Sequence, residues 1–155
     1  MAKSGSKKPD GPAKITNRRA SYDYEILSRF EAGIALEGSE VKSIFRGQGN
    51  LAGAFCRVEN GEIWVYDMEV QPYAKASSFQ PDRRRKRKLL LHKSEIGLLK
   101  RRSEERSLAV IPLSVYFKNG RAKMEIGIAR GKRQYDKREK IEAKDVRRER
   151  EHGAD

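Results

Sequence analysis

Two Asn-Gly pairs interrupt this chain, and each lies between segments in which apolar and polar residues alternate. The pairs are Asn60-Gly61 and Asn119-Gly120. Asparagine and glycine accept the positive φ angles of a type I′ turn, so each pair predicts two antiparallel strands joined by two residues. Around the second pair, the alternation of Ile111, Leu113, Val115 and Phe117, resumed over 122–128, predicts one register for the hairpin.

Two further segments have the period of a strand. The even-numbered residues from 24 to 36 keep one phase across Gly33, which predicts either one strand bent at that glycine or two consecutive strands. In the segment 63–70, Ile63 and Val65 are expected on one face. The opposite face is expected to carry Trp64, Tyr66, Met68 and Val70.

Two segments predict short helices. Residues 38–47 place Val41, Ile44 and Phe45 at helical spacing and end at a glycine, which is a common helix stop. Residues 92–106 predict a second helix, in which Ile96 and Leu99 are the expected buried pair.

About six strands, two hairpins and two short helices favour a mainly β fold. The expected form is an antiparallel barrel of the oligonucleotide-binding (OB) type, partly open and capped by helices, with a β-sandwich as the alternative. Residues 1–14 have the composition of a flexible basic arm, residues 15–129 are expected to form the barrel, and residues 130–155 form a separate tail.

The chain is strongly basic, and its charge is segregated. The net charge is +13 over 155 residues, with +5 over residues 1–19, +6 over residues 82–93 and −4 between them. The run 83–88 consists of six consecutive cations, which form either a solvated loop or a cradle for phosphates. Nucleic acid is the favoured polyanion, because release of its condensed counterions relieves the repulsion among the cations. A membrane surface is less favoured, because no amphipathic helix adjoins the run.

Several classes of protein are disfavoured by what the sequence lacks. Cys56 is the single cysteine, and His92 and His152 lie far apart, so we expect no disulfide framework, metal or cofactor. Neither histidine stands at the spacing of a catalytic motif, so an enzyme is not expected. The sequence has no apolar run long enough to cross a bilayer and no secretion signal at its start, which predicts a soluble, cytoplasmic protein.

The tail has helical propensity but few apolar side chains. Its only large ones are Tyr135, Ile141 and Val146, too few to dock a helix on the barrel. We expect it to be largely unfolded in the free protein and able to fold against a negatively charged surface. A tail that only confers solubility is the alternative.

The motifs of this chain, taken together and in order, resemble those of the SsrA-binding protein (small protein B) family of bacterial trans-translation. The resemblance covers residues 16 to about 145. It implies an OB-type barrel that binds the tRNA-like domain of transfer-messenger RNA (tmRNA, or SsrA RNA) as a 1:1 monomer. The complex would reach stalled ribosomes, where the tail enters the empty mRNA channel as a helix. The matching stretches are Asn17-Arg18-Arg19-Ala20, Tyr24-Glu25-Ile26-Leu27, Phe30-Glu31-Ala32-Gly33-Ile34, Glu40-Val41-Lys42-Ser43, residues 87–93, residues 116–120, Ala129-Arg130-Gly131-Lys132 and Tyr135-Asp136-Lys137-Arg138-Glu139.

The resemblance also implies roles for single residues. Asn17, Glu31 and Leu90 match positions that the family uses for RNA binding, although Asn17 could instead support a turn, Glu31 a polar strand face and Leu90 the core. Candidate phosphate contacts are Arg18, Arg19, Lys42, Arg84, Arg85, Arg87, Lys88 and Lys93. The stretch matching the ribosome-engaging tail comprises Gly131, Lys132, Arg133, Tyr135, Asp136, Lys137 and Arg138.

Two departures from the family pattern and two rival functions stay open. Phe45 stands where arginine is usual, and Pro81 and Arg83 replace the usual histidine and proline around Asp82. A non-specific single-strand binder is the main rival function, since it also uses a basic barrel with exposed aromatic residues. A structural ribosomal protein is the other.

Overall fold

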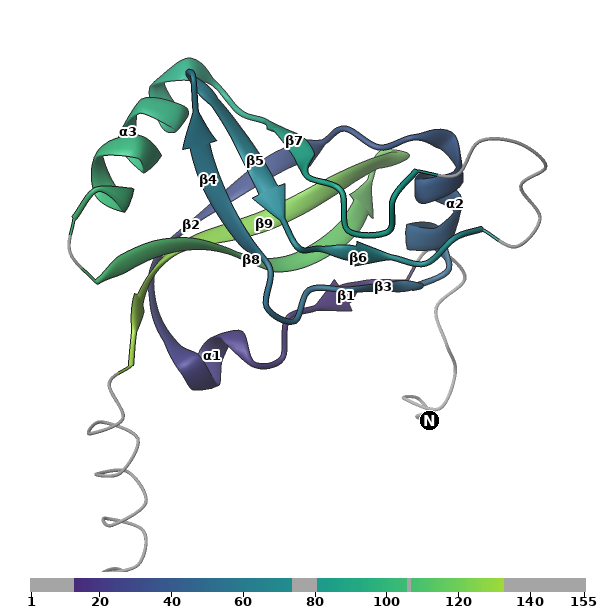
Figure 1. Cartoon of the computed structure of the whole chain (residues 1–155), viewed down its shortest axis with the longest axis horizontal. Coiled ribbons are helices and arrows are strands. Elements are labelled where there is room, and N and C mark those ends of the chain that lie inside the picture. The colour runs from purple at the N-terminus through teal and green to yellow at the C-terminus, as the bar shows by residue number, and fades with distance from the viewer. Residues whose placement is uncertain (1–12, 74–80, 106, 133–155) are drawn as a thin grey trace, which may run out of the picture.

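Seven strands of the computed structural model form one antiparallel sheet, and six of them close into a barrel (Figure 1). The structure describes residues 13–73, 81–105 and 107–132. Around the barrel the order is β8-β4-β5-β7-β2-β9, and β9 pairs with β8 to complete the ring, while β1 pairs with β8 at Ser114 and Val115. The predicted OB-type barrel is confirmed, and within the described residues its ring is closed rather than partly open.

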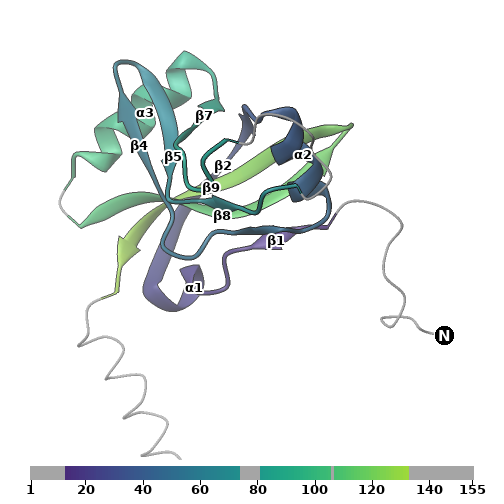
Figure 2. The same ribbon diagram turned by 45° about the vertical axis from the view of Figure 1, so that its right-hand side comes forward.

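The elements follow one another in a simple order. The strands are β1 (Ile15–Thr16), β2 (Tyr24–Ile34), β3 (Gly49–Asn50), β4 (Phe55–Glu59), β5 (Glu62–Tyr66), β6 (Glu69–Val70), β7 (Arg87–Leu90), β8 (Leu108–Lys118) and β9 (Arg121–Gly131). The helices are α1 (Ala20–Asp23), α2 (Gly38–Phe45) and α3 (Lys93–Ser103). Helices α2 and α3 lie at different sides of the barrel, and α1 lies near β1 at its lower edge in Figure 2.

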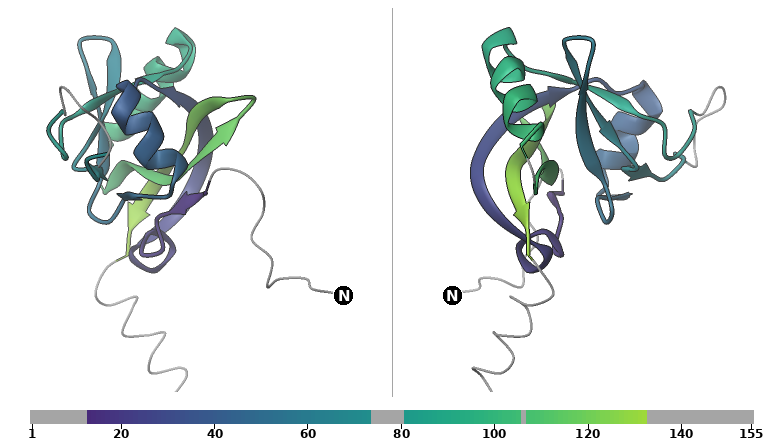
Figure 3. Two further views of the ribbon diagram at one scale, coloured as in Figure 1. Left: turned by 90° about the vertical axis from the view of Figure 1, so that its right-hand side faces the viewer. Right: turned by 60° about the vertical axis from the view of Figure 1, so that its left-hand side comes forward.

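Strand β2 is a long curved strand that lies between β9 and β7 in the barrel (Figure 3). It pairs with β9 along its length and with β7 at Gly33 and Ile34. The predicted bend at Gly33 therefore falls where β2 is shared between two partners. The predicted phase holds across Gly33, because Ala32 and Ile34 on either side of it are both buried. It fails earlier in the strand, where a β-bulge at Leu27 shifts the register between Ile26 and Ser28.

Both predicted hairpin turns are confirmed. Asn60 and Gly61 have φ of 51° and 76°, and Asn119 and Gly120 have φ of 53° and 75°. The predicted alternation through the second hairpin was wrong at Leu113, where β8 has a bulge between Pro112 and Ser114. Ile111 and Leu113 consequently pack with Ala20 and Ala129 in a small second cluster, while Val115 lies in the main core.

The two predicted faces of β5 are also corrected. Ile63 and Val65 point into the core and are fully buried, whereas Trp64 and Tyr66 lie on the outer side, partly exposed. Met68 and Val70 are nevertheless buried as well. The reason is Asp67, whose φ of 61° ends the strand and resets which residues face inward.

The two predicted helices are confirmed, and their ends have clear causes. In α2, Glu37 and Glu40 form a capping box. A Schellman motif ends this helix, because the N–H groups of Gln48 and Gly47 donate to the carbonyls of Ser43 and Ile44 at 2.9 Å, with Gly47 at a φ of 76°. Helix α3 begins at a second capping box, formed by His92 and Glu95, and ends at Ser103 rather than at 106.

Helix α3 covers the weakest seam of the barrel. Strands β4 and β8 are paired at a single position, Cys56 with Val110. The helix lies against both strands and inserts Leu99, which is fully buried, into the main core. Among residues 13–73, 81–105 and 107–132, no helix has the length and apolar character needed to cross a membrane.

Candidate nucleic-acid interface

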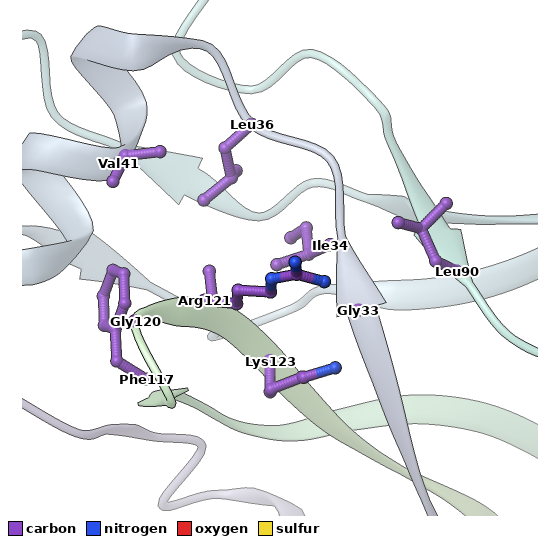
Figure 4. A pocket seen from close by; sticks show the side chains of 10 residues that line it. Gly33, Ile34, Leu36, Val41, Leu90, Phe117, Gly120, Arg121 and Lys123 are labelled. Atoms are coloured by element: carbon purple, nitrogen blue, oxygen red, sulfur yellow. The ribbon is translucent and has the colours of Figure 1, made fainter.

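A groove runs over the outer surface of the barrel between the end of β2, strand β7 and the β8–β9 hairpin, and Figure 4 shows the part of it bordered by Phe117 and Arg121. It consists of two adjoining hollows of about 320 and 440 Å³, which share Gly33, Leu90 and Lys123. One hollow is bordered by Leu36, Val41 and Phe117 and by the cation Arg121. The other is bordered by Glu31, Leu91, His92 and Glu95. This groove therefore combines an apolar floor with both signs of charge.

Leu90 is an exposed wall of this groove rather than a core residue. Its exposed fraction is 54%, whereas its neighbour Leu89 is buried at 1% and faces the barrel interior. Leu90 pairs with Gly33 across β7 and β2, and a Cβ atom at Gly33 would come within 3.3 Å of the Leu90 Cβ. The glycine therefore lets the leucine side chain lie across β2. An exposed leucine at this place is suited to apolar contact with an unstacked base.

Glu31 stands on β2 at the edge of the groove and is held by two side chains of β8. The Tyr116 hydroxyl donates a hydrogen bond to Glu31 Oε2, and Lys118 Nζ lies 3.4 Å from Glu31 Oε1. The hydrogen bond from Tyr116 is the main cause that lowers the pKa of Glu31 below its ordinary value. The carboxylate is therefore ionised at neutral pH and can accept further hydrogen bonds.

Three cationic side chains lie in or next to the groove. Arg121 and Lys123 line it, and Lys93 is exposed at the start of α3, directly after the lining residue His92. Within the described part of the chain, none of the three has a carboxylate within 4 Å. Their charges are available to a phosphate without first breaking an internal ion pair.

The basic run 83–88 is different, because every one of its cations is paired with an acidic side chain. The N–O distances range from 2.6 to 3.8 Å. All four acids belong to the net-negative segment 20–81. The pairs are Arg83–Glu69, Arg84–Glu69, Arg85–Glu40, Lys86–Glu59, Arg87–Glu40 and Lys88–Glu62. The charge of the run is therefore largely neutralised within the fold. Neither alternative predicted from the sequence, a cradle for phosphates or a solvated loop, included these ion pairs.

The structure contradicts the prediction that Arg87 contacts a phosphate. Its side chain is 0% exposed, and Glu40, its ion-pair partner, is 3% exposed. The guanidinium donates from Nε and Nη2 to Glu40 Oε2 at 2.8 and 2.6 Å, and from Nη1 to the carbonyl of Met68 at 2.7 Å. Nη1 and Nη2 also reach the carbonyls of Arg85 and Arg83. All five donors are thus satisfied inside the protein, and Arg87 has no path to a phosphate.

The N-terminal candidates lie away from the groove. The Asn17 amide donates to the carbonyl of Pro112 at 2.9 Å, which secures the entry into α1 against β8. Arg18 is exposed, and Arg19 lies 3.5 Å from Asp23. The structure therefore supports the turn-supporting alternative for the amide nitrogen of Asn17 and leaves Arg18 facing solvent.

Lys42 lies on α2, outside both the groove and the N-terminal segment. Its Nζ lies 5.4 Å from the centre of the Tyr73 ring, and the Arg46 guanidinium lies 5.2 Å from the same ring. Phe45, the departure from the family pattern, packs edge-on against Phe117 with ring centres 5.5 Å apart. An apolar contact thus occupies the position where an arginine is usual.

The second departure leaves a defined local turn. Asp82 Oδ1 accepts a hydrogen bond from the backbone N–H of Arg84 at 2.8 Å, and the Asp82 carbonyl accepts one from Arg85. Asp82 therefore organises the turn although Arg83 stands in place of proline.

Of the residues matched to the ribosome-engaging tail, two are described, and both are attached to the barrel. Gly131 is the last residue of β9 and pairs with Tyr24. Lys132 donates from its backbone to Asp23 and from its side chain to the carbonyl of Ser21, both at 2.9 Å. Arg133, Tyr135, Asp136, Lys137 and Arg138 lie outside the described residues, as do residues 1–12 of the predicted arm. The barrel extends at least to Gly131, beyond the expected boundary at 129.

Sequence reasoning missed three residues of this surface. Arg121, Lys123 and Tyr116 were predicted only as members of a hairpin. The turn at Asn119-Gly120 could have identified them, since it places Tyr116 opposite Lys123. Nothing in local spacing connects Glu40 with Arg87, which are 47 positions apart.

The closed barrel, with a groove that joins an exposed leucine, a carboxylate and unpaired cations, defines a protein of the OB-like, nucleic-acid-binding class. The family model described as SmpB protein matches residues 14–154. The chain therefore belongs to the SmpB protein family.

Individual relatives agree with this assignment. An SsrA-binding protein of Carboxydothermus hydrogenoformans is 50% identical over 133 residues, covering 86% of this chain and 89% of the relative. An SsrA-binding protein of a Sulfurihydrogenibium species is 52% identical over 134 residues, covering 86% and 88%. A solved chain described as "tmRNA-SmpB: a journey to the center of the bacterial ribosome" superposes with a TM-score of 0.69 at 46% identity, covering 83% of this chain and 94% of that chain.

Proposed function

We propose that this protein binds the tRNA-like domain of tmRNA and delivers it to stalled ribosomes for trans-translation. Membership of the SmpB family supports this function, as do relatives named for SsrA binding and a similar chain described with tmRNA and the ribosome. The observation that carries it is the groove, where Leu90, Glu31 and the unpaired Arg121 and Lys123 meet on one face. Such a protein acts in the cytoplasm, as a monomer bound 1:1 to the RNA.

Each side chain of the groove has a distinct part in RNA binding. Leu90 makes apolar contact with an unstacked base, and Glu31 accepts hydrogen bonds from base amino groups or from 2′-hydroxyls. Arg121, Lys123 and Lys93 neutralise phosphates, and Arg18 and Lys42 add two outlying cations. A 2′-hydroxyl is present only in RNA, so the carboxylate contributes selectivity against DNA while the cations contribute affinity.

The barrel and the tail have separate functions in this proposal. Residues 13–132 bind tmRNA, and residues 133–155 enter the empty mRNA channel of the stalled ribosome and fold there as a helix. The basic residues of the tail favour this partner, since contacts with a polyanionic surface offset the entropy lost when a charged segment becomes ordered. The arm of residues 1–12 adds non-specific attraction to RNA.

Competition between RNA and DNA tests the function. The full-length protein is bound to labelled tmRNA at fixed salt, and unlabelled tRNA-like domain or single-stranded DNA of equal length is added. We expect the tRNA-like domain to displace the label at a concentration at least about 100-fold lower than the DNA, because specific RNA contacts add to the shared electrostatic attraction. Equal displacement would support the non-specific single-strand binder instead.

The ion pairs of the run 83–88 change the expected effect of removing charge. Replacing Arg121 and Lys123 together with glutamine should lower the salt slope of tmRNA binding by about one unit for each phosphate that the variant no longer neutralises. The same change at Arg84 and Lys88 should lower it by less, because their carboxylate partners already hold these cations. Titrations between low and physiological salt measure both slopes. A larger decrease in the Arg84 and Lys88 variant would place the RNA on the run and not on the groove.

A further inference from the structure

We propose that Tyr116 is a positioning residue for RNA binding, whose hydroxyl holds the Glu31 carboxylate in the orientation in which it accepts hydrogen bonds from tmRNA. This inference rests on the proposed function, because it assumes that Glu31 faces the bound RNA. It assigns a role to a tyrosine that lies two strands away from the residue on which it acts.

The strand register brings the two side chains to one face. Glu31 on β2 stands opposite Glu125 on β9, and the next outward pair is Gly33 with Lys123. Lys123 in turn stands opposite Tyr116 on β8. Residues directly opposite one another share a face of the sheet, so the tyrosine reaches over β9 to the carboxylate. Because Gly33 has no side chain, Glu31 meets no neighbour toward the groove on its own strand.

Glu31 needs to be held because its cross-strand neighbour carries the same charge. Two carboxylates directly opposite on adjacent strands repel each other. Arg29 engages Glu125 at 3.2 Å, while the Tyr116 hydroxyl and Lys118 engage the two oxygens of Glu31. A carboxylate has about four acceptor sites. These two contacts occupy one site on each oxygen and leave a second site on each for an RNA donor.

The protonation states suit this arrangement at neutral pH. Burial and the hydrogen bond to Glu31 raise the pKa of Tyr116 to about 12, so the phenol keeps the proton that it donates. That hydrogen bond also lowers the pKa of Glu31. The pair is therefore a fixed donor and a fixed acceptor, and RNA meets a carboxylate whose orientation is already determined before binding.

The test is Tyr116→Phe, which removes the hydroxyl and keeps the ring. Affinity for the tRNA-like domain should fall about tenfold at pH 7, the scale of one hydrogen bond to a charged group. The acid limb of the binding profile should also move to higher pH, because without the hydrogen bond the pKa of Glu31 rises. In a Glu31→Gln background the same change should have almost no further effect.

The chain offers a matched control. The Tyr66 hydroxyl donates to Glu59 at 2.5 Å, and Lys86 lies 3.3 Å from the same carboxylate, which repeats the Tyr–Glu–Lys arrangement outside the groove. Tyr66→Phe should leave tmRNA affinity unchanged. An equal decrease in both variants, an unmoved acid limb, or additive effects of Tyr116→Phe and Glu31→Gln would each overturn the positioning role.

The proposed function and the positioning role fail in different ways. If the unaltered protein shows no preference for the tRNA-like domain over single-stranded DNA, the proposed function fails. If that preference is present, Glu31→Gln weakens it, and Tyr116→Phe binds as tightly as the unaltered protein, the positioning role alone fails.

Discussion

Replacing Glu40 with alanine is expected to lower the free energy of unfolding by about 3–5 kcal/mol. Glu40 accepts five hydrogen bonds: two each from Arg85 and Arg87 and one from the backbone N–H of Glu37. The alanine variant leaves Arg87 charged, fully buried and without its carboxylate, and it also removes half of the capping box of α2. Urea unfolding monitored by circular dichroism measures the difference.

The control for this change is Glu62→Ala, which removes an exposed ion pair with Lys88 and should cost at most about 1 kcal/mol. A double variant, Glu40→Met with Arg87→Met, should be far less destabilised than Glu40→Ala, since no charge is then left buried. If Glu40→Ala unfolds at the same urea concentration as Glu62→Ala, the buried ion pair contributes no more to stability than the exposed one.

The same carboxylate predicts loss of stability in acid. Burial raises the pKa of Glu40, but the hydrogen bonds from Arg85, Glu37 and Arg87 outweigh it and hold the pKa below the ordinary value. Its contribution is therefore complete above the pKa of the unfolded state, about 4.3, and is lost as pH falls through the lower folded pKa. In Glu40→Gln this part of the acid dependence should be absent.

Truncation after Lys132 is expected to abolish trans-translation, measured as the tagging of incomplete proteins on stalled ribosomes, while tmRNA affinity stays within about twofold of the full chain. The groove and all of β9 lie before this position, so the proposed RNA-binding face is complete. What is removed is the segment proposed to enter the mRNA channel. A translation reaction on an mRNA without a stop codon reports tagging, and a titration with the tRNA-like domain reports affinity.

The position of the cut decides whether the truncation removes the tail alone or also disturbs the barrel. A cut after Ala129 would also remove Arg130, Gly131 and the bonds of Lys132 to Ser21 and Asp23, and so loosen β9 against β2 and α1. We therefore expect the chain cut after Ala129 to have a lower thermal unfolding midpoint than the chain cut after Lys132. If the chain that ends at Lys132 loses tmRNA binding while remaining folded, the division between barrel and tail is wrong.

Local features of the fold could be predicted from the sequence, because their causes are local. The type I′ turns at Asn60-Gly61 and Asn119-Gly120 follow from the backbone freedom of those residues. The bulges at Leu27 and Leu113 could not be predicted from periodicity. Each inserts one residue whose neighbours continue to alternate, so the face changes without a visible break in the pattern.

The candidate site was predicted in part. Glu31 and Leu90 came from family motifs, and the structure brings them to one groove. The run 83–88 predicted a phosphate site because six cations stand together, yet its partners Glu40, Glu59, Glu62 and Glu69 belong to other elements. Pairing between distant charges depends on the fold, so a charge count along the chain overstates what the run presents to solvent.

Strand β9 sets a fixed span across the molecule. Its first residues border the groove, and its last residue is followed by Lys132, tied to α1. About nine residues separate Lys123 from Lys132 along the chain, which corresponds to at most roughly 30 Å. If RNA binds in the groove as proposed, the distance from the RNA to the start of the remaining chain is set by a strand that is paired on both sides rather than by a linker.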